Sequence, residues 1–77
     1  MRQQKGEGTM TDKNLLRSAM FAKGFNGETL AEKLGLSRQS FSYKLNSKRP
    51  FTTEEIGVIY DLLELTPEQA MTIFFGK

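Results

Sequence analysis

The side chains best able to do chemistry in this 77-residue chain are its cations, and they are unevenly distributed. Residues 1–50 hold ten Lys and Arg against four Asp and Glu, whereas residues 51–77 hold one Lys against five acids. The overall charge of +2 therefore hides a net charge of +6 in the first part and −4 in the second. Such an asymmetry lets one end of a small protein face a polyanion while the other end does not.

Catalytic and metal chemistry is poorly represented. The chain has no Cys, which excludes disulfides, thiolate metal sites and thiol nucleophiles, and it lacks His, the commonest general base and neutral metal ligand. Ser, Lys and Tyr are present, but no nucleophile–base arrangement is readable. Glu54, Glu55 and Glu68 fall in expected first helical turns, where a carboxylate suits the helix dipole, so we interpret them as structural. We expect a protein that is not an enzyme and needs no cofactor, metal or small-molecule substrate.

Apolar spacing and helix start signals predict an all-α fold, a small bundle of about five short helices. No segment alternates with a period of two, which disfavours strands. Residues 1–10 are polar and without periodicity, so we expect a flexible N-terminal tail followed by one domain over residues 11–77. The expected N-caps are Thr11 or Asp12, Asn26, Ser37, Thr52 and Thr66. The first helix is expected to run through Leu15, Leu16, Ala19, Met20 and Ala22, and the expected inward face of the fourth consists of Ile56, Ile59, Tyr60 and Leu63.

The second and third expected helices are separated only by Gly35, Leu36 and Ser37. Gly35 can take a positive φ, Leu36 can turn inward to fill the corner, and Ser37 can cap the next helix. The third helix is then buried on one side and shows polar residues to solvent on the other. The seam predicted across this corner consists of Leu30, Leu34, Leu36, Phe41 and Leu45.

Residues 26–46 resemble the helix-turn-helix of the Cro/C1 (XRE-like) family of phage and bacterial DNA-binding regulators. More loosely, the resemblance extends from about residue 11 to residue 66, the five-helix arrangement of a lambda-repressor-like DNA-binding domain. The features that match are apolar Leu30, small Ala31, apolar Leu34, turn-forming Gly35, apolar Leu36, capping Ser37, apolar Phe41 and the closing Asn46.

The resemblance implies that the third helix enters the major groove of double-stranded DNA with its N-terminal residues against base edges. The base-reading residues it implies are Arg38, Gln39, Ser42 and Tyr43. The phosphate contacts it implies come from Asn26, Gly27, Lys44, Asn46, Ser47, Lys48 and Arg49. Two positions depart from the family pattern: Gly27 stands where many relatives have a phosphate-binding Gln, and Lys44 where an apolar residue is frequent. Arg17 and Lys23 are interpreted as ordinary surface charges.

The last expected helix carries more apolar side chains than one core face needs, so we expect some of them to meet a partner subunit. These residues are Met71, Ile73, Phe74 and Phe75. The leading hypothesis is a sequence-specific transcriptional regulator of Cro/C1 type, a repressor of phage origin that binds DNA as a homodimer. The alternative is a protein-interaction module, such as an antirepressor, that uses the C-terminal apolar helix. Without an apolar run of about 20 residues or a signal-peptide pattern, we expect a cytoplasmic protein with no membrane partner.

Overall fold

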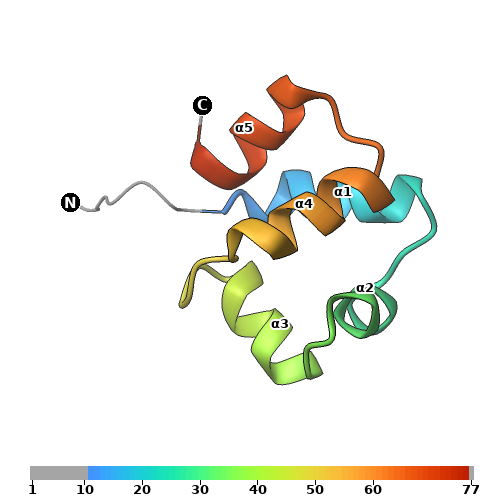
Figure 1. The fold of residues 1–77 in the computed structure, drawn as a ribbon, viewed down its shortest axis with the longest axis vertical. Coiled ribbons are helices and arrows are strands. Elements are labelled where there is room, and N and C mark those ends of the chain that lie inside the picture. The colour runs from blue at the N-terminus through green and yellow to red at the C-terminus, as the bar shows by residue number, and fades with distance from the viewer. Residues whose placement is uncertain (1–10, 77) are drawn as a thin grey trace.

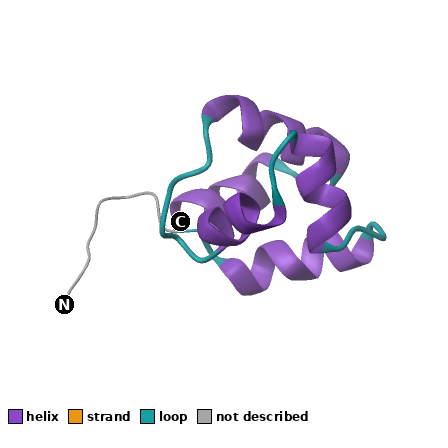
Figure 2. Cartoon of the chain, turned by 90° about the horizontal axis from the view of Figure 1, so that it is seen from below, coloured by secondary structure: helices purple, strands orange, loops and turns teal. Residues whose placement is uncertain are grey.

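A computed structural model of the chain describes residues 11–76, and the tail predicted for residues 1–10 lies outside them. Within the described residues the chain forms helices joined by short loops, with no strand (Figure 2). The helices are α1 (Lys13–Ala22), α2 (Gly27–Leu34), α3 (Arg38–Leu45), α4 (Thr53–Leu62) and α5 (Pro67–Phe75). In Figure 1, α2 and α3 lie together at one end of the molecule, α5 lies at the other, and α1 and α4 lie between them. The predicted all-α class and number of helices are confirmed for this part of the chain.

Each helix is preceded by an N-cap residue whose polar side chain accepts a hydrogen bond from an N–H group of the first helical turn. Asp12, rather than Thr11, caps α1 by accepting from the N–H of Leu15 at 3.1 Å. The expected caps Thr52 and Thr66 each form a capping box, with Glu55 and Gln69, and a third in α2 pairs Asn26 with Thr29. Local sequence thus decides where the helices start, independently of what they pack against.

The core is a single cluster that draws on every helix. Its aromatic centre is a chain of edge-to-face contacts in which Phe51 lies between Phe41 of α3 and Phe74 of α5, with ring centroids 6.0 and 5.6 Å apart. Such contacts add to the burial of apolar area. The buried apolar residues are Leu16, Met20, Leu30, Ala31, Phe41, Phe51, Ile59, Leu63, Leu65, Ala70, Ile73 and Phe74.

The inward face predicted for the fourth helix is correct in part. Ile59 of α4 and Leu63, the residue that caps its C-terminal end, are buried, while Ile56 and Tyr60 are half-buried. α1 contains the residues expected of the first helix, of which Leu16 and Met20 are buried, while Leu15 and Ala22 are exposed. Leu16 and Met20 are four residues apart and lie on the same face of α1, which faces the core. Leu15 lies about 100° further round the helix and so misses the core.

The corner between α2 and α3 has the predicted conformation. Gly35 has a φ of 72°, in the left-handed region, and the N–H of Leu36 donates to the carbonyl of Ala31 at 2.9 Å. Ser37 caps α3 by accepting from the N–H of Ser40. Of the predicted seam, Leu30 and Phe41 are buried, and the other three members are only half-buried because the corner lies at the end of the molecule.

None of the five helices, over the residues the structure describes, combines the length and apolar character needed to cross a bilayer.

Leu15 and Leu16 provide a matched pair of core and surface truncations in one helix. We expect Leu16→Ala to lower the free energy of unfolding by about 2–5 kcal/mol, because Leu16 is fully buried and its truncation leaves a cavity. We expect Leu15→Ala, at a position that is 42 % exposed, to cost less than about 1 kcal/mol. Urea denaturation of the two variants measures both values. Equal losses would contradict this description of the core.

Candidate nucleic-acid interface

The outer side of α3 is a polar ridge that no other described element covers. Phe41 alone among its residues is buried, and the residues predicted to read bases are all exposed. In Figure 1, α3 lies at the end of the molecule with only α2 and the start of α4 beside it. We use the name α3 ridge for Arg38, Gln39, Ser42 and Tyr43. The structure therefore brings the four predicted base readers together on an accessible surface.

Gln39 and Tyr43 form the crest of the α3 ridge. With a rotation of about 100° per residue around the helix axis, Gln39 and Tyr43 each lie about 160° from the buried Phe41, one on either side of the point opposite it. The side-chain amide of Gln39 donates to the Tyr43 hydroxyl at 3.3 Å, which aligns the two groups one turn apart. Arg38 points only about 60° from Phe41 and so leaves α3 low on its flank. The ridge offers an amide and a phenol at its top and a guanidinium at its edge.

Some of the side chains predicted to contact phosphate are free to bind a ligand, and others already form hydrogen bonds within the protein. Lys48 and Arg49 are exposed, and neither takes part in a salt bridge among the described residues. Asn26 is occupied, because its side chain caps α2 by accepting from the N–H of Thr29 at 2.8 Å. Gly27, at the first position of α2, offers only its backbone N–H, as expected.

Asn46 and Ser47 hold the loop after α3 against the start of α1. The Asn46 amide nitrogen donates to the Ser42 carbonyl at 2.9 Å, and its oxygen accepts from the Lys13 ammonium at 3.0 Å. Ser47 has a φ of 63°, and its hydroxyl oxygen accepts from the buried backbone N–H of Thr11 at 3.0 Å. Both side chains therefore have an internal role that the sequence interpretation had not assigned to them.

The ammonium group of Lys44 is also bound within the protein and is not free at the surface. Its Nζ lies 2.7 and 2.8 Å from the two carboxylate oxygens of Glu55, and the side chains are only 13 % and 14 % exposed. Oxygen Oε1 of Glu55 also accepts from the N–H of Thr52, the cap of α4. Burial raises the pKa of Glu55, but the hydrogen bonds from Lys44 and Thr52 and the charge of Lys44 bring that pKa below its ordinary value. The pair ties α3 to α4, so Lys44 is withdrawn from the set of phosphate contacts.

Two cations of α1 lie beside α3 although their sequence pattern did not single them out. Lys13 and Arg17 line a hollow of about 270 Å³ between α1, the start of α2 and α3. Arg38, Ser42 and Asn46 line its α3 side. The spacing of Lys13 and Arg17, four residues apart on one helix face, was a usable signal, but only the fold places them beside α3.

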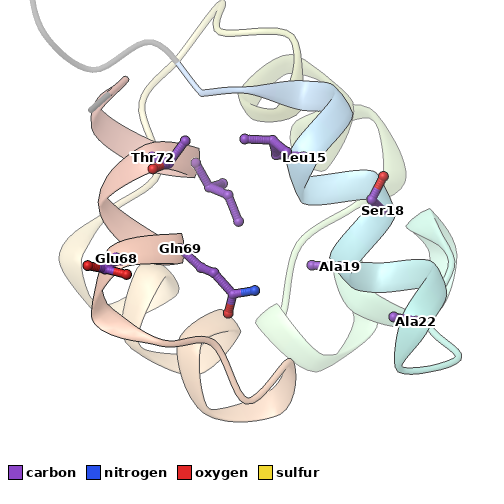
Figure 3. A pocket seen from close by; sticks show the side chains of 8 residues that line it. Leu15, Ser18, Ala19, Ala22, Glu68, Gln69 and Thr72 are labelled. Carbon is purple, nitrogen blue, oxygen red and sulfur yellow. The ribbon is translucent and has the colours of Figure 1, made fainter.

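The four apolar residues of α5 expected at a partner interface do not share one surface. Ile73 and Phe74 are 3 % and 2 % exposed and belong to the core, so they are not available to a partner. Met71 and Phe75 are exposed, one turn apart. α1 and α5 enclose an open groove of about 440 Å³, with Leu15 and Ala19 of α1 facing Gln69 and Thr72 of α5 (Figure 3).

The described residues include no group of three or more acidic side chains close enough to hold a metal ion. What residues 11–76 do offer near α3 is a polar ridge flanked by cations. Comparisons of the chain with protein-family models, with curated proteins and with solved structures found no match.

Glu55→Gln tests the charge that joins α3 to α4. The pKa of Glu55 is lowered on folding, so its charge stabilises the fold at pH values above its ordinary pKa of 4.5. This contribution is lost as the pH falls through the pKa that Glu55 has in the folded state. At pH 7 we expect Glu55→Gln to lower the free energy of unfolding by about 1–3 kcal/mol, and the difference from the unmutated protein to shrink toward pH 3. Urea denaturation across this pH range measures it.

Glu54→Gln is the matched control, because Glu54 lies in the same first turn but is exposed. Its effect should be within about 0.5 kcal/mol at neutral pH. A loss at Glu55 that does not depend on pH, or one no larger than the loss at Glu54, would show that the ion pair is not what holds the two helices together.

Proposed function

We propose that the protein is a sequence-specific regulator that binds double-stranded DNA, with α2 and α3 as its helix-turn-helix and α3 in the major groove. The observation that carries the proposal is the α3 ridge, which is polar, is covered by none of the described residues and is bordered by cations that form no salt bridge within residues 11–76. The resemblance of residues 26–46 to Cro/C1-type regulators supports the same conclusion. The acidic last part of the chain fits a molecule that turns only one end to a polyanion.

The chemistry of the ridge suits base edges in the major groove. A Gln side chain can pair bidentately with adenine, and the amide of Gln39 is exposed and aligned by Tyr43. The ring of Tyr43 can contact a thymine methyl group, and its hydroxyl a base or a phosphate. Lys48 and Arg49, which are exposed in the loop after α3, would contact the DNA backbone. Contacts of this kind supply affinity and register, while base contacts supply discrimination.

Regulation would follow from occupancy of an operator by a homodimer. Two copies related by a twofold axis place their α3 helices in successive major-groove faces, about 34 Å apart. The exposed Met71 and Phe75 of α5 are the side chains we assign to the contact between copies. A bound dimer then represses transcription by excluding polymerase, with no cofactor taking part.

A second function, that of a protein-interaction module, is favoured by the groove between α1 and α5. Its lining includes the exposed Leu15, and Met71 and Phe75 are exposed on α5. Titration of random-sequence duplex DNA at two salt concentrations separates the two functions. A DNA-binding protein loses affinity steeply as salt rises, whereas an interaction module that does not bind DNA has no such affinity to lose.

Gln39→Ala tests base reading directly. With a duplex obtained by unbiased selection, we expect this variant to weaken binding by about 1–3 kcal/mol, because a bidentate pair with one base is lost. Binding to a random duplex should change much less. Fluorescence anisotropy with both duplexes measures the two losses, and equal losses would refute a base-reading role for Gln39.

Lys48→Ala tests backbone binding by the loop after α3. We expect weaker binding to selected and random duplexes alike, and a salt slope reduced by about one unit, because one phosphate contact is removed. Lys23→Ala is the control, since Lys23 lies at the far end of α1 and pairs with Glu64 at 2.9 Å. Should both variants change the slope equally, Lys48 has no specific contact with the backbone.

A further inference from the structure

We propose that the groove between α1 and α5 receives a second copy of this chain, with Phe21 of each copy inserted into the groove of the other. We call this arrangement the Phe21 contact. It uses a different surface from the contact assigned to Met71 and Phe75 of α5, and it does not depend on DNA binding. It therefore goes beyond the proposed function.

Phe21 is the most exposed of the large apolar side chains in the part of the chain that the structure describes, at 86 %. It lies about 100° round α1 from the buried Met20 and so points away from the core. A single exposed ring is common on protein surfaces and does not by itself indicate a partner. What makes Phe21 a candidate anchor is the groove on the neighbouring face of the same helix.

The groove between α1 and α5 offers the apolar surface that a phenyl ring requires. Leu15 and Ala19 lie on its α1 side, and most of its lining is apolar (Figure 3). Because a cavity of about 150 Å³ is enough to hold benzene, a groove of about 440 Å³ has room for the ring of Phe21. An aromatic side chain buried in such a groove is a typical anchor of a protein interface.

The charges of the two surfaces are complementary. The residues that line the groove include one carboxylate, that of Glu68, and no cation. A hollow beside Phe21 has the opposite character, because Arg17 is the one charged residue that lines it. Neither Arg17 nor Glu68 takes part in a salt bridge within residues 11–76. Docking of a second copy brings the guanidinium of Arg17 toward the carboxylate of Glu68 as Phe21 enters the groove.

This chain therefore carries both halves of one contact, which is why we assign the groove to a second copy and not to a different protein. Ser18 lines both the groove and the hollow beside Phe21, so it lies between the two halves on α1. In a twofold pair each contact is made twice, once in each direction. A twofold axis that passes beside Ser18 brings each Phe21 to the groove of the other copy and closes the assembly at two chains. The interface is small, so we expect the association to be weak and reversible.

Sedimentation equilibrium of the full chain carrying Phe75→Ala measures the Phe21 contact without the contact assigned to α5. We expect this variant to form a reversible dimer, and we expect added Phe21→Ala to raise the dissociation constant at least about tenfold, because two aromatic anchors are lost. Val58→Ala is the control, since it truncates an exposed apolar side chain of α4, and it should leave the constant unchanged. A monomer at all chain concentrations up to about 1 mM, or a constant that does not respond to Phe21→Ala, would overturn the Phe21 contact.

An exchange of charges tests the same contact without removing an apolar side chain. We expect Arg17→Glu and Glu68→Arg each to weaken the dimer, because each places like charges opposite one another. The double variant Arg17→Glu, Glu68→Arg should regain affinity, because it restores a pair of opposite charges. If the double variant is as weak as the two single variants combined, these side chains do not meet and the arrangement is wrong.

The chain contains no Cys, so a single introduced thiol reports on the twofold axis. We expect Ser18→Cys to form a covalent dimer on oxidation in air faster than Val58→Cys, and we expect added Phe21→Ala to remove that difference. Equal rates for the two thiols would contradict an axis beside Ser18. None of these measurements contains DNA, so the Phe21 contact can fail while the proposed function stands, and it can stand if the protein does not bind DNA.

Discussion

The edge-to-face contacts of Phe41 with Phe51, and of Phe51 with Phe74, tie α3 to the rest of the core. Phe41 is the one residue of α3 that is buried, so the position of the whole helix depends on how this ring packs. A helix of eight residues is not stable alone, because its own hydrogen bonds do not compensate the cost of ordering it. Its exposed side is free for other chemistry because so little of the helix is needed for the core.

The buried ring of Phe41 fixes the position of α3 but does not by itself prevent the helix from rotating about its axis. Two polar attachments restrict this rotation. The Lys44–Glu55 pair joins the inner side of α3 to the cap of α4. Just after the C-terminal end of α3, Asn46 binds Lys13, the first residue of α1, and Ser47 binds the backbone of Thr11, which precedes α1. These attachments hold the α3 ridge in one orientation, and such preorganisation is what recognition of a rigid duplex requires.

The same residues explain why a family pattern cannot be transferred position by position. Lys44 and Ser47 occupy places that the resemblance assigned to phosphate, yet here both are used to hold the fold together. Lys13 and Arg17, the cations that line the hollow beside α3, belong to a different element, α1.

The sequence by itself determined the features that depend on neighbours along the chain. Caps at Asn26, Ser37, Thr52 and Thr66 and the left-handed Gly35 were predictable, because a first-turn N–H group is satisfied within three residues of its acceptor and only a few residue types adopt a positive φ readily. The exposure of Gln39 and Tyr43 followed from the same local periodicity.

Tertiary structure alone decided which of several equivalent side chains meet. Leu15 and Leu16, or Phe74 and Phe75, are alike in sequence, but the core reaches only one of each pair. The contacts of Lys44 with Glu55, of Lys13 with Asn46 and of Thr11 with Ser47 span 11, 33 and 36 positions. No local pattern encodes such pairs, because the packing of whole helices, and not the spacing of residues, sets the distance between their polar atoms.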